Sequence, residues 1–169
     1  GHAGAHLTRA RILVRLGSRR EAIDEYSRGI ELAQRSDHDG KGAQPDDYLE
    51  RARSLACEQR VDEAIQGLDE GATARGGAIT LQFLAIDLEA GRQRWDGALA
   101  RLAAIEAKAN RKETWMARRA EILVHAGRVD EARVVYTSAL ATIDALPERL
   151  RTTTTTTELA GRIRASLAN

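Results

Sequence analysis

The chain has 169 residues, enough for one domain with a hydrophobic core, and its 43% hydrophobic content is that of a globular protein. Its 26 basic and 25 acidic residues leave a net charge of only +1. This balance excludes an overall electrostatic attraction to nucleic acid or to an anionic membrane.

The basic residues are almost all arginine, since only Lys41, Lys108 and Lys112 are lysine, and with abundant Ala and Gly this is typical of a GC-rich bacterial gene. The single cysteine, Cys57, excludes an internal disulfide and leaves both the bacterial cytoplasm and the periplasm open as compartments. No run approaches the roughly 20 apolar residues that span a bilayer, and none has the form of a signal peptide. Because the chain begins with Gly-His-Ala-Gly rather than Met, we expect it to be a piece of a longer protein.

Apolar residues recur with helical spacing along the chain. The predicted elements are nine helices and no strand, at residues 5–17, 19–36, 46–58, 60–74, 78–91, 94–109, 112–126, 128–145 and 154–168. An Asp/Gly-rich stretch that ends at Pro45 predicts a loop between the second and third helices. A run of threonines precedes the last helix, where Thr155 and Glu158 fit a capping box.

Four copies of one pattern follow each other along these helices. They align on an alanine in the second helix of each copy, and successive alanines are 42, 34 and 34 residues apart. Residues four and seven positions after each alanine lie with it on one helical face, where small side chains allow a neighbouring helix to approach. These sets are Ala22, Tyr26 and Gly29; Ala64, Leu68 and Gly71; Ala98, Leu102 and Ile105; and Ala132, Tyr136 and Ala139.

A first helix precedes each of these second helices, so the repeat is a helix pair. In copies one, two and four it carries an alanine and a leucine three residues apart, namely Ala10 and Leu13, Ala52 and Leu55, and Ala120 and Leu123. In copy three Gly91 lies seven residues before Ala98, whereas Gly17 and Gly127 lie five residues before their alanines. This spacing predicts a turn two residues longer in copy three.

A hairpin period of 34 residues with the pattern G-x-x-x-x-A-x-x-x-Y resembles the tetratricopeptide repeat (TPR) family, and "RWDGAL" and "GRVDEA" are similar to its turn region. The resemblance covers about residues 5–146, and an irregular helical bundle is the alternative. It implies an all-α fold, a right-handed superhelix (α-solenoid) of stacked hairpins that forms a single domain over residues 1–169. The repeats are expected at residues 5–36, 46–75, 78–109 and 112–146, with a capping helix at 154–168.

The resemblance also implies a function, because in the family the first helices line a concave groove that binds peptides or protein surfaces. We therefore expect a non-catalytic protein-interaction or scaffold module and no enzyme. The alternative is a regulatory or assembly domain of a larger bacterial protein, enzymatic or envelope-associated. Nucleic-acid binding is not expected, since the arginines are scattered among nearly as many acids.

Helical spacing places the candidate groove residues on one face of each first helix. In copy four, Ala120 and Leu123 point to the core, which leaves Arg118, Glu121 and His125 on another face. We expect a mixed-charge groove in which arginines bind the carboxylates of an extended or helical segment, and the alternative is a solvated polar face. The matching sets in copies one to three are Thr8, Arg11 and Arg15; Glu50, Arg53 and Cys57; and Gln82, Ala85 and Glu89, with Arg11, Arg53 and Arg118 as the anchors.

The sequence predicts no catalytic residue, cofactor or metal site. His2 and His6 have the spacing of metal ligands on a helix, but a frayed terminus is the simpler interpretation. His38 lies in a stretch that lacks the closing Glu of a calcium loop. Cys57, expected to be half-buried, and His125 occupy matching positions two copies apart, which is too far for a catalytic dyad.

The two ends of the repeat array differ. Leu159, Ile163 and Leu167 step by four in the last helix, which should cover one end of the stack. No such helix precedes the first copy. We therefore expect either further sequence or self-association at that end, through residues such as Leu7, Ile12 and Val14.

Overall fold

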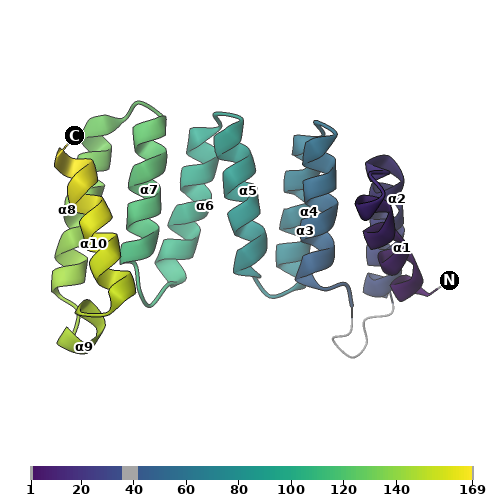
Figure 1. Ribbon diagram of the computed structural model, residues 1–169, viewed down its shortest axis with the longest axis horizontal. Helices are drawn as coiled ribbons and strands as arrows, with labels where there is room; N and C mark the ends of the chain where they lie inside the picture. The colour runs from purple at the N-terminus through teal and green to yellow at the C-terminus, as the bar shows by residue number, and fades with distance from the viewer. Residues whose placement is uncertain (1, 36–41, 169) are drawn as a thin grey trace. The chain divides into compact units, whose positions relative to one another are not determined.

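The computed structural model describes residues 2–35 and 42–168, and the regular structure in these residues is helical without any strand. His38 and the adjacent residues that were compared with a calcium loop lie outside the described residues. The expected all-α fold of helix pairs is confirmed. The helices are α1 (Ala3–Arg15), α2 (Arg19–Arg35), α3 (Pro45–Cys57), α4 (Val61–Ala74), α5 (Ile79–Gly91), α6 (Trp95–Lys108), α7 (Glu113–His125), α8 (Val129–Asp144), α9 (Glu148–Arg151) and α10 (Thr154–Ala168) (Figure 1).

The four-residue helix α9 was not expected from the sequence. It forms directly after Pro147, whose carbonyl accepts the backbone N–H groups of Leu150 and Arg151. Proline is compatible with the start of a helix because the N–H it lacks would have no partner there.

The chain divides into two compact units, residues 1–88 and residues 89–169. The first unit holds α1 to α4 and most of α5, and the second begins near the end of α5 and holds α6 to α10. In the first unit α1 packs on α2, α2 on α3, and α3 on α4, whereas in the second α6 packs on α7 and α7 on α8. The single domain that the sequence predicts stays a prediction.

One turn geometry joins the two helices of every copy. The residue five positions before each second-helix alanine has a left-handed backbone, with φ of 81° at Gly17, 62° at Gln59, 58° at Gln93 and 75° at Gly127. This arrangement is the Schellman motif, which satisfies the last carbonyls of a helix while the chain reverses. The residue after the left-handed one donates its backbone N–H to a carbonyl oxygen of the first helix. These bonds are Ser18 to Leu13 at 3.0 Å, and Arg60 to Leu55, Arg94 to Glu89 and Arg128 to Leu123 at 2.9 Å each.

The longer turn predicted in copy three is wrong. Three residues separate the helices in every copy, at residues 16–18, 58–60, 92–94 and 126–128. Gly91 is the last residue of α5, and Gln93 takes the left-handed position that glycine takes in copies one and four. A glutamine adopts this left-handed backbone at a cost of about 1 kcal/mol. The position of Gly91 therefore does not indicate where the turn lies. The register of copy three is therefore shifted by two residues.

Small residues allow the helices of the first unit to pack closely. The predicted second-helix set is buried, with Ala22, Tyr26, Ala64 and Leu68 all at 0% exposure. On α2, Gly29 receives the side chain of α1 Leu7, because a Cβ at Gly29 would lie 2.6 Å from the leucine Cδ2. Burial of a leucine of this kind contributes about 1.5–3 kcal/mol.

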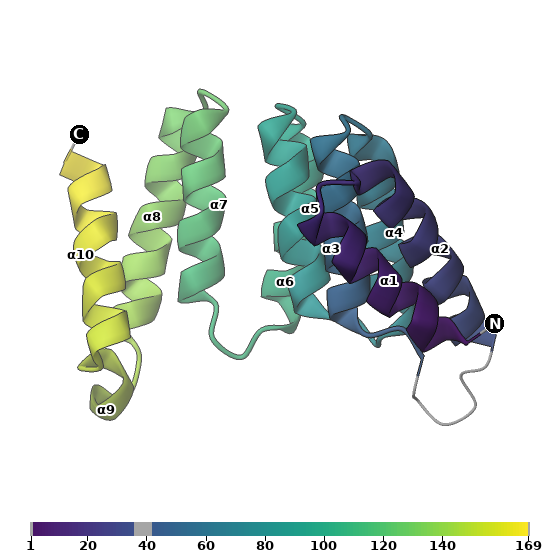
Figure 2. The same ribbon diagram turned by 45° about the vertical axis from the view of Figure 1, so that its right-hand side comes forward.

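Helix α10 covers α7 and α8 in the second unit (Figure 2). Its Leu159 and Ile163 are buried in one cluster with Leu123 of α7 and Tyr136 of α8, and Leu167 packs against this cluster. The capping helix predicted from the steps of four is therefore confirmed.

The predicted capping box of Thr155 and Glu158 is wrong, because α10 begins earlier, at Thr154. The hydroxyl of Thr153 accepts the backbone N–H of Thr156 at 3.4 Å and donates to the Thr156 hydroxyl at 2.9 Å. Thr156 is buried and also accepts a bond of 2.9 Å from Nη2 of Arg111. Threonine is a favourable N-cap, and in a run of six threonines the packing of Thr156 selects which one serves.

Helix α1 and the residue that follows it leave two large apolar side chains in solvent, since Ile12 is 52% and Leu16 74% exposed. Leu7 is buried against α2 and is not available for contact with another molecule. Val14 is partly buried and packs against the core. Self-association stays a prediction, in which Ile12 and Leu16 are the accessible residues.

The left-handed turns predict a stabilising substitution. We expect Gln93→Gly to raise the free energy of unfolding by about 0.5–1 kcal/mol, because glycine removes the steric cost of positive φ. Gln66→Gly, in the interior of α4, is the matched control and should lower it by about 1 kcal/mol. Chemical denaturation measures both, and equal losses in the two variants would contradict the turn assignment.

The close approach of helices in copy four predicts a destabilising substitution. Ala132 is 1% exposed, so Ala132→Leu should overpack this hairpin and cost about 1–3 kcal/mol. Ala141→Leu, on the exposed side of the same helix, should change stability by less than about 0.5 kcal/mol. Thermal unfolding compares the two variants, and an unchanged melting temperature for Ala132→Leu would show that this face is not packed.

Candidate functional site

The candidate site is the face of each first helix that the sequence predicts to bind a partner. We call it the first-helix face and define it by the residues fourteen, eleven and seven positions before each second-helix alanine. With the register set by Gln93, its members are Thr8, Arg11 and Arg15; Glu50, Arg53 and Cys57; Leu84, Asp87 and Gly91; and Arg118, Glu121 and His125.

Arg11 joins α1 to α3 on this face. Its Nη2 donates to Oδ1 of Asp47 over 2.8 Å, and Asp47 is buried. Oδ2 of the same carboxylate accepts the backbone N–H of Gln44 at 2.9 Å, at the start of α3. About half of the Arg11 side chain remains exposed. Arg11 therefore connects two first helices and still presents positive charge at the surface.

Arg53 and Arg118 each pair with a carboxylate of their own helix. Nη1 of Arg53 donates to Glu50 over 2.6 Å, and Nη1 of Arg118 donates to Glu121 over 3.1 Å. Exposed pairs three residues apart contribute little to stability. The guanidinium groups can therefore exchange these carboxylates for others at small energetic cost.

Three further members of the first-helix face, Arg15, Cys57 and His125, are the last residues of α1, α3 and α7. Cys57 is exposed rather than half-buried as expected, because it is the last residue of α3 and precedes the turn. Nδ1 of His125 lies 2.7 Å from the carbonyl oxygen of Glu121, so the proton on Nδ1 is donated to the backbone. Arg15 is exposed at the corresponding end of α1.

The three residues predicted for copy three lie elsewhere because of the register shift. Nε2 of Gln82 lies 3.3 Å from Oδ1 of Asp69 on α4. Ala85 is buried, and Glu89 is 9% exposed with its Oε1 accepting a bond of 3.1 Å from Nε of Arg101. A role for Gln82 and Glu89 in binding stays a prediction, while the register makes Leu84, Asp87 and Gly91 the equivalents of the other sets.

Glu89 occupies a core position, since the equivalent residues of the other copies are Leu13, Leu55 and Leu123. Gly97 of α6 leaves space for it, because a Cβ at Gly97 would clash with Oε2 of Glu89. This oxygen is buried and accepts no hydrogen bond within the described residues. A buried carboxylate at a leucine position was missed because copy three was aligned on Gly91.

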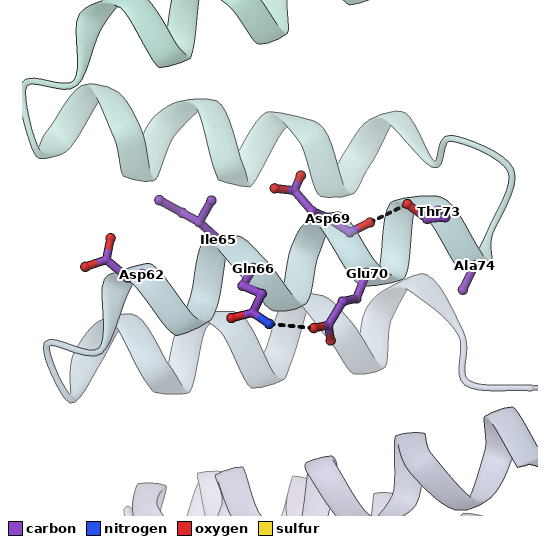
Figure 3. A pocket seen from close by; sticks show the side chains of 7 residues that line it. All are labelled: Asp62, Ile65, Gln66, Asp69, Glu70, Thr73 and Ala74. Atoms are coloured by element: carbon purple, nitrogen blue, oxygen red, sulfur yellow. Dashed lines mark hydrogen bonds between the residues drawn. The ribbon is translucent and has the colours of Figure 1, made fainter.

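One side of α4 forms an open acidic hollow of about 740 Å³ that sequence reasoning did not single out. Figure 3 shows its carboxylates, Asp62, Asp69 and Glu70, along the same helix as the apolar side chains of Ile65 and Ala74. These residues step by three and four along a second helix, so they lie on one helical face.

Other classes of site find little support in the described residues. No group of three or more His, Cys, Asp and Glu residues there is arranged to hold a metal ion.

Nδ1 of His6 bonds Oε2 of Glu25 at 2.7 Å, and this bond, together with the charges of Arg9 and Arg28, lowers the pKa of Glu25. None of the helices in the described ranges is long and apolar enough to cross a membrane.

The two kinds of arginine on this face predict different effects on stability. Arg11→Gln should lower the free energy of unfolding by about 1–2 kcal/mol, because it removes a charged partner of the buried Asp47. Arg53→Gln breaks an exposed pair and should cost at most about 0.5 kcal/mol. Denaturation of both variants tests this order, and equal effects would mean that the Asp47 contact does not hold α1 on α3.

No protein-family model matches the sequence, and no curated protein is significantly similar to it. Solved structures, in contrast, match nearly the whole chain. The structure of the MamA RS-1 ArsTM double mutant is 15% identical with a TM-score of 0.59, and the match covers 97% of this chain and 93% of that chain. Two structures of kinesin light chain nearly identical TPR-like repeats from Podosopora anserina are 16% identical with TM-scores of 0.56, and cover 97% of this chain and 93% or 94% of theirs. The chain therefore has the helical-repeat fold of TPR-like proteins, as its repeat pattern predicts.

Proposed function

We propose that the chain is a non-catalytic scaffold for protein–protein interaction, and that the first-helix face binds a segment of a partner protein. The observation that supports this most is a set of arginines that neighbouring carboxylates orient but do not cover. Arg11, Arg53 and Arg118 are 55%, 58% and 44% exposed. A guanidinium group binds a carboxylate through two parallel hydrogen bonds, which favours partner segments that carry Asp or Glu.

The charges on this face favour a peptide over a polyanion. Each arginine lies beside a carboxylate of the chain itself, from Asp47, Glu50 or Glu121. Nucleic acid would bring its phosphates close to these carboxylates as well as to the arginines. A peptide can place single acids opposite the arginines and neutral groups elsewhere, so the alternation of charge gives specificity.

The packing of the first unit favours binding without rearrangement. The contact from Arg11 to the buried Asp47 fixes α1 against α3, and Arg53 lies on the same helix as Asp47. The backbone of packed helices loses little conformational entropy when a ligand binds. The spacing of the helices that carry Arg11 and Arg53 is therefore set before the partner arrives, while the exposed Arg53 side chain can still adjust to the ligand.

Selection of short random peptides against the protein tests this proposal. We expect the enriched peptides to carry Asp or Glu. The double variant Arg53→Glu and Arg118→Glu should bind them at least about tenfold more weakly, a loss of roughly 1.4 kcal/mol. Fluorescence anisotropy of labelled peptides measures the affinity, and circular dichroism verifies that the helices are intact.

The matched control is Arg35→Glu with Arg133→Glu, which makes the same change in net charge at exposed positions of second helices. It should leave the affinity unchanged. If the enriched peptides lack acidic residues, or if binding survives reversal of Arg53 and Arg118, the first-helix face is not the binding site.

A further inference from the structure

A small polar furrow of about 180 Å³ is lined by residues of α2, α3 and α4. Ser27 of α2, Arg51 of α3 and Glu70 of α4 contribute to its lining. Arg60 and Glu63 also line it, but they bind each other through two bonds of 2.7 Å. Among these charged residues, Arg51 therefore has the least satisfied hydrogen-bonding groups.

Arg51 is a largely buried cation without a hydrogen-bond acceptor in the described residues. Its side chain is 13% exposed, and the closest carboxylate oxygen, from Glu70, lies 3.8 Å from Nη2. The guanidinium carbon lies 5.9 Å from the centroid of the Tyr48 ring. Burial lowers the pKa of Arg51, against the opposing effects of Glu70 and Tyr48. Such a group gains more from a bound anion than an exposed arginine does, because water solvates it less.

Gly67 preserves the space for this cation. A Cβ at Gly67 would clash with Nη2 of Arg51 and would lie 3.2 Å from its Cζ. The glycine therefore allows the guanidinium group to lie close to α4 within the furrow.

The second unit contains a furrow at the same place in the repeat, and it shows how a carboxylate reaches this arginine position. Arg119 there is the equivalent of Arg51, since each lies thirteen residues before its second-helix alanine. Nη1 of Arg119 lies 3.2 Å from Oε2 of Glu106, a residue of the preceding second helix. The position in α2 that corresponds to Glu106 is occupied by the buried Ile30. Arg119 thus has a carboxylate close to Nη1, although its own Nε and the Glu106 oxygen have no hydrogen-bond partner within the described residues, whereas the preceding second helix brings no acid to Arg51.

We propose that the furrow between α2 and α4 binds the carboxylate of an Asp or Glu side chain from a partner protein, with Arg51 as the principal donor. The volume of the furrow suits one side chain, so the partner inserts a single acidic residue rather than a whole segment. Glu70 is the competing group. Its side chain is 52% exposed and accepts a bond of 3.0 Å from Gln66 of the same helix (Figure 3).

Titration with N-acetyl-glutamate amide, followed by the NMR signal of the Arg51 Nε–H group, tests the proposal. We expect a saturable shift of this signal, and none with N-acetyl-glutamine amide, which has the same shape without the charge. Glu70→Gln should raise the affinity about two- to fivefold, because it removes an exposed competing charge. Gly67→Ala should lower the affinity, because the new methyl group displaces the guanidinium.

The double variant Arg53→Glu and Arg118→Glu should retain the shift, which separates this site from the first-helix face. Circular dichroism of each variant identifies any loss of fold. Arg51→Lys, followed through the backbone amide signal of Gly67 because the Arg51 Nε–H group is absent, provides a charge-conserving control that should bind more weakly. Equal shifts with the glutamine amide, or no gain of affinity in Glu70→Gln, would overturn the proposal. Tighter binding of inorganic phosphate than of the glutamate amide would also overturn it, since the furrow would then be a site for free oxyanions.

Discussion

The left-handed residue in each turn is the constraint on which the rest of the structure depends. It directs the chain back along the first helix after only three residues, and the Schellman hydrogen bonds fix the angle at which it leaves. Because the turn is the same in all four copies, residues at equal distances from it occupy equivalent helical positions. Their burial still depends on what packs against each copy, since Ile12 is 52% exposed whereas its equivalent in copy four, Ile122, is 3% exposed.

Charge is distributed over this framework in two different ways. On the first-helix face, Arg53 and Arg118 form exposed pairs with acids of their own helix, so their geometry is adjustable. Between hairpins, Arg51 and Arg119 are held among packed helices, where an unmatched charge is costly. The near-neutral composition thus conceals an ordered arrangement, which the counts of basic and acidic residues alone do not reveal.

The sequence was sufficient to predict the helix pairs and their buried residues, because the alanine-centred sets repeat with a period that leaves few alternatives. It was insufficient wherever a residue acts against its usual preference. Gln93 adopts a backbone that glycine normally supplies, and this displaced the copy-three part of the candidate site by two residues. Thr153 caps α10 because Thr156 is buried, which the run of threonines could not specify. The partners of Arg11 and Arg51 come from neighbouring helices, so they required the three-dimensional arrangement.

Glu89 and Gly97 have a consequence for how this chain can vary in evolution. In copies one, two and four, leucine occupies the position of Glu89 and glutamate the position of Gly97, at Glu21, Glu63 and Glu131. In copy three, the carboxylate instead reaches from the first helix into the space next to residue 97. A change at either position alone leaves a clash or an unfilled space. The two positions should therefore covary among related sequences, and a reversion to leucine at one should accompany a larger residue at the other.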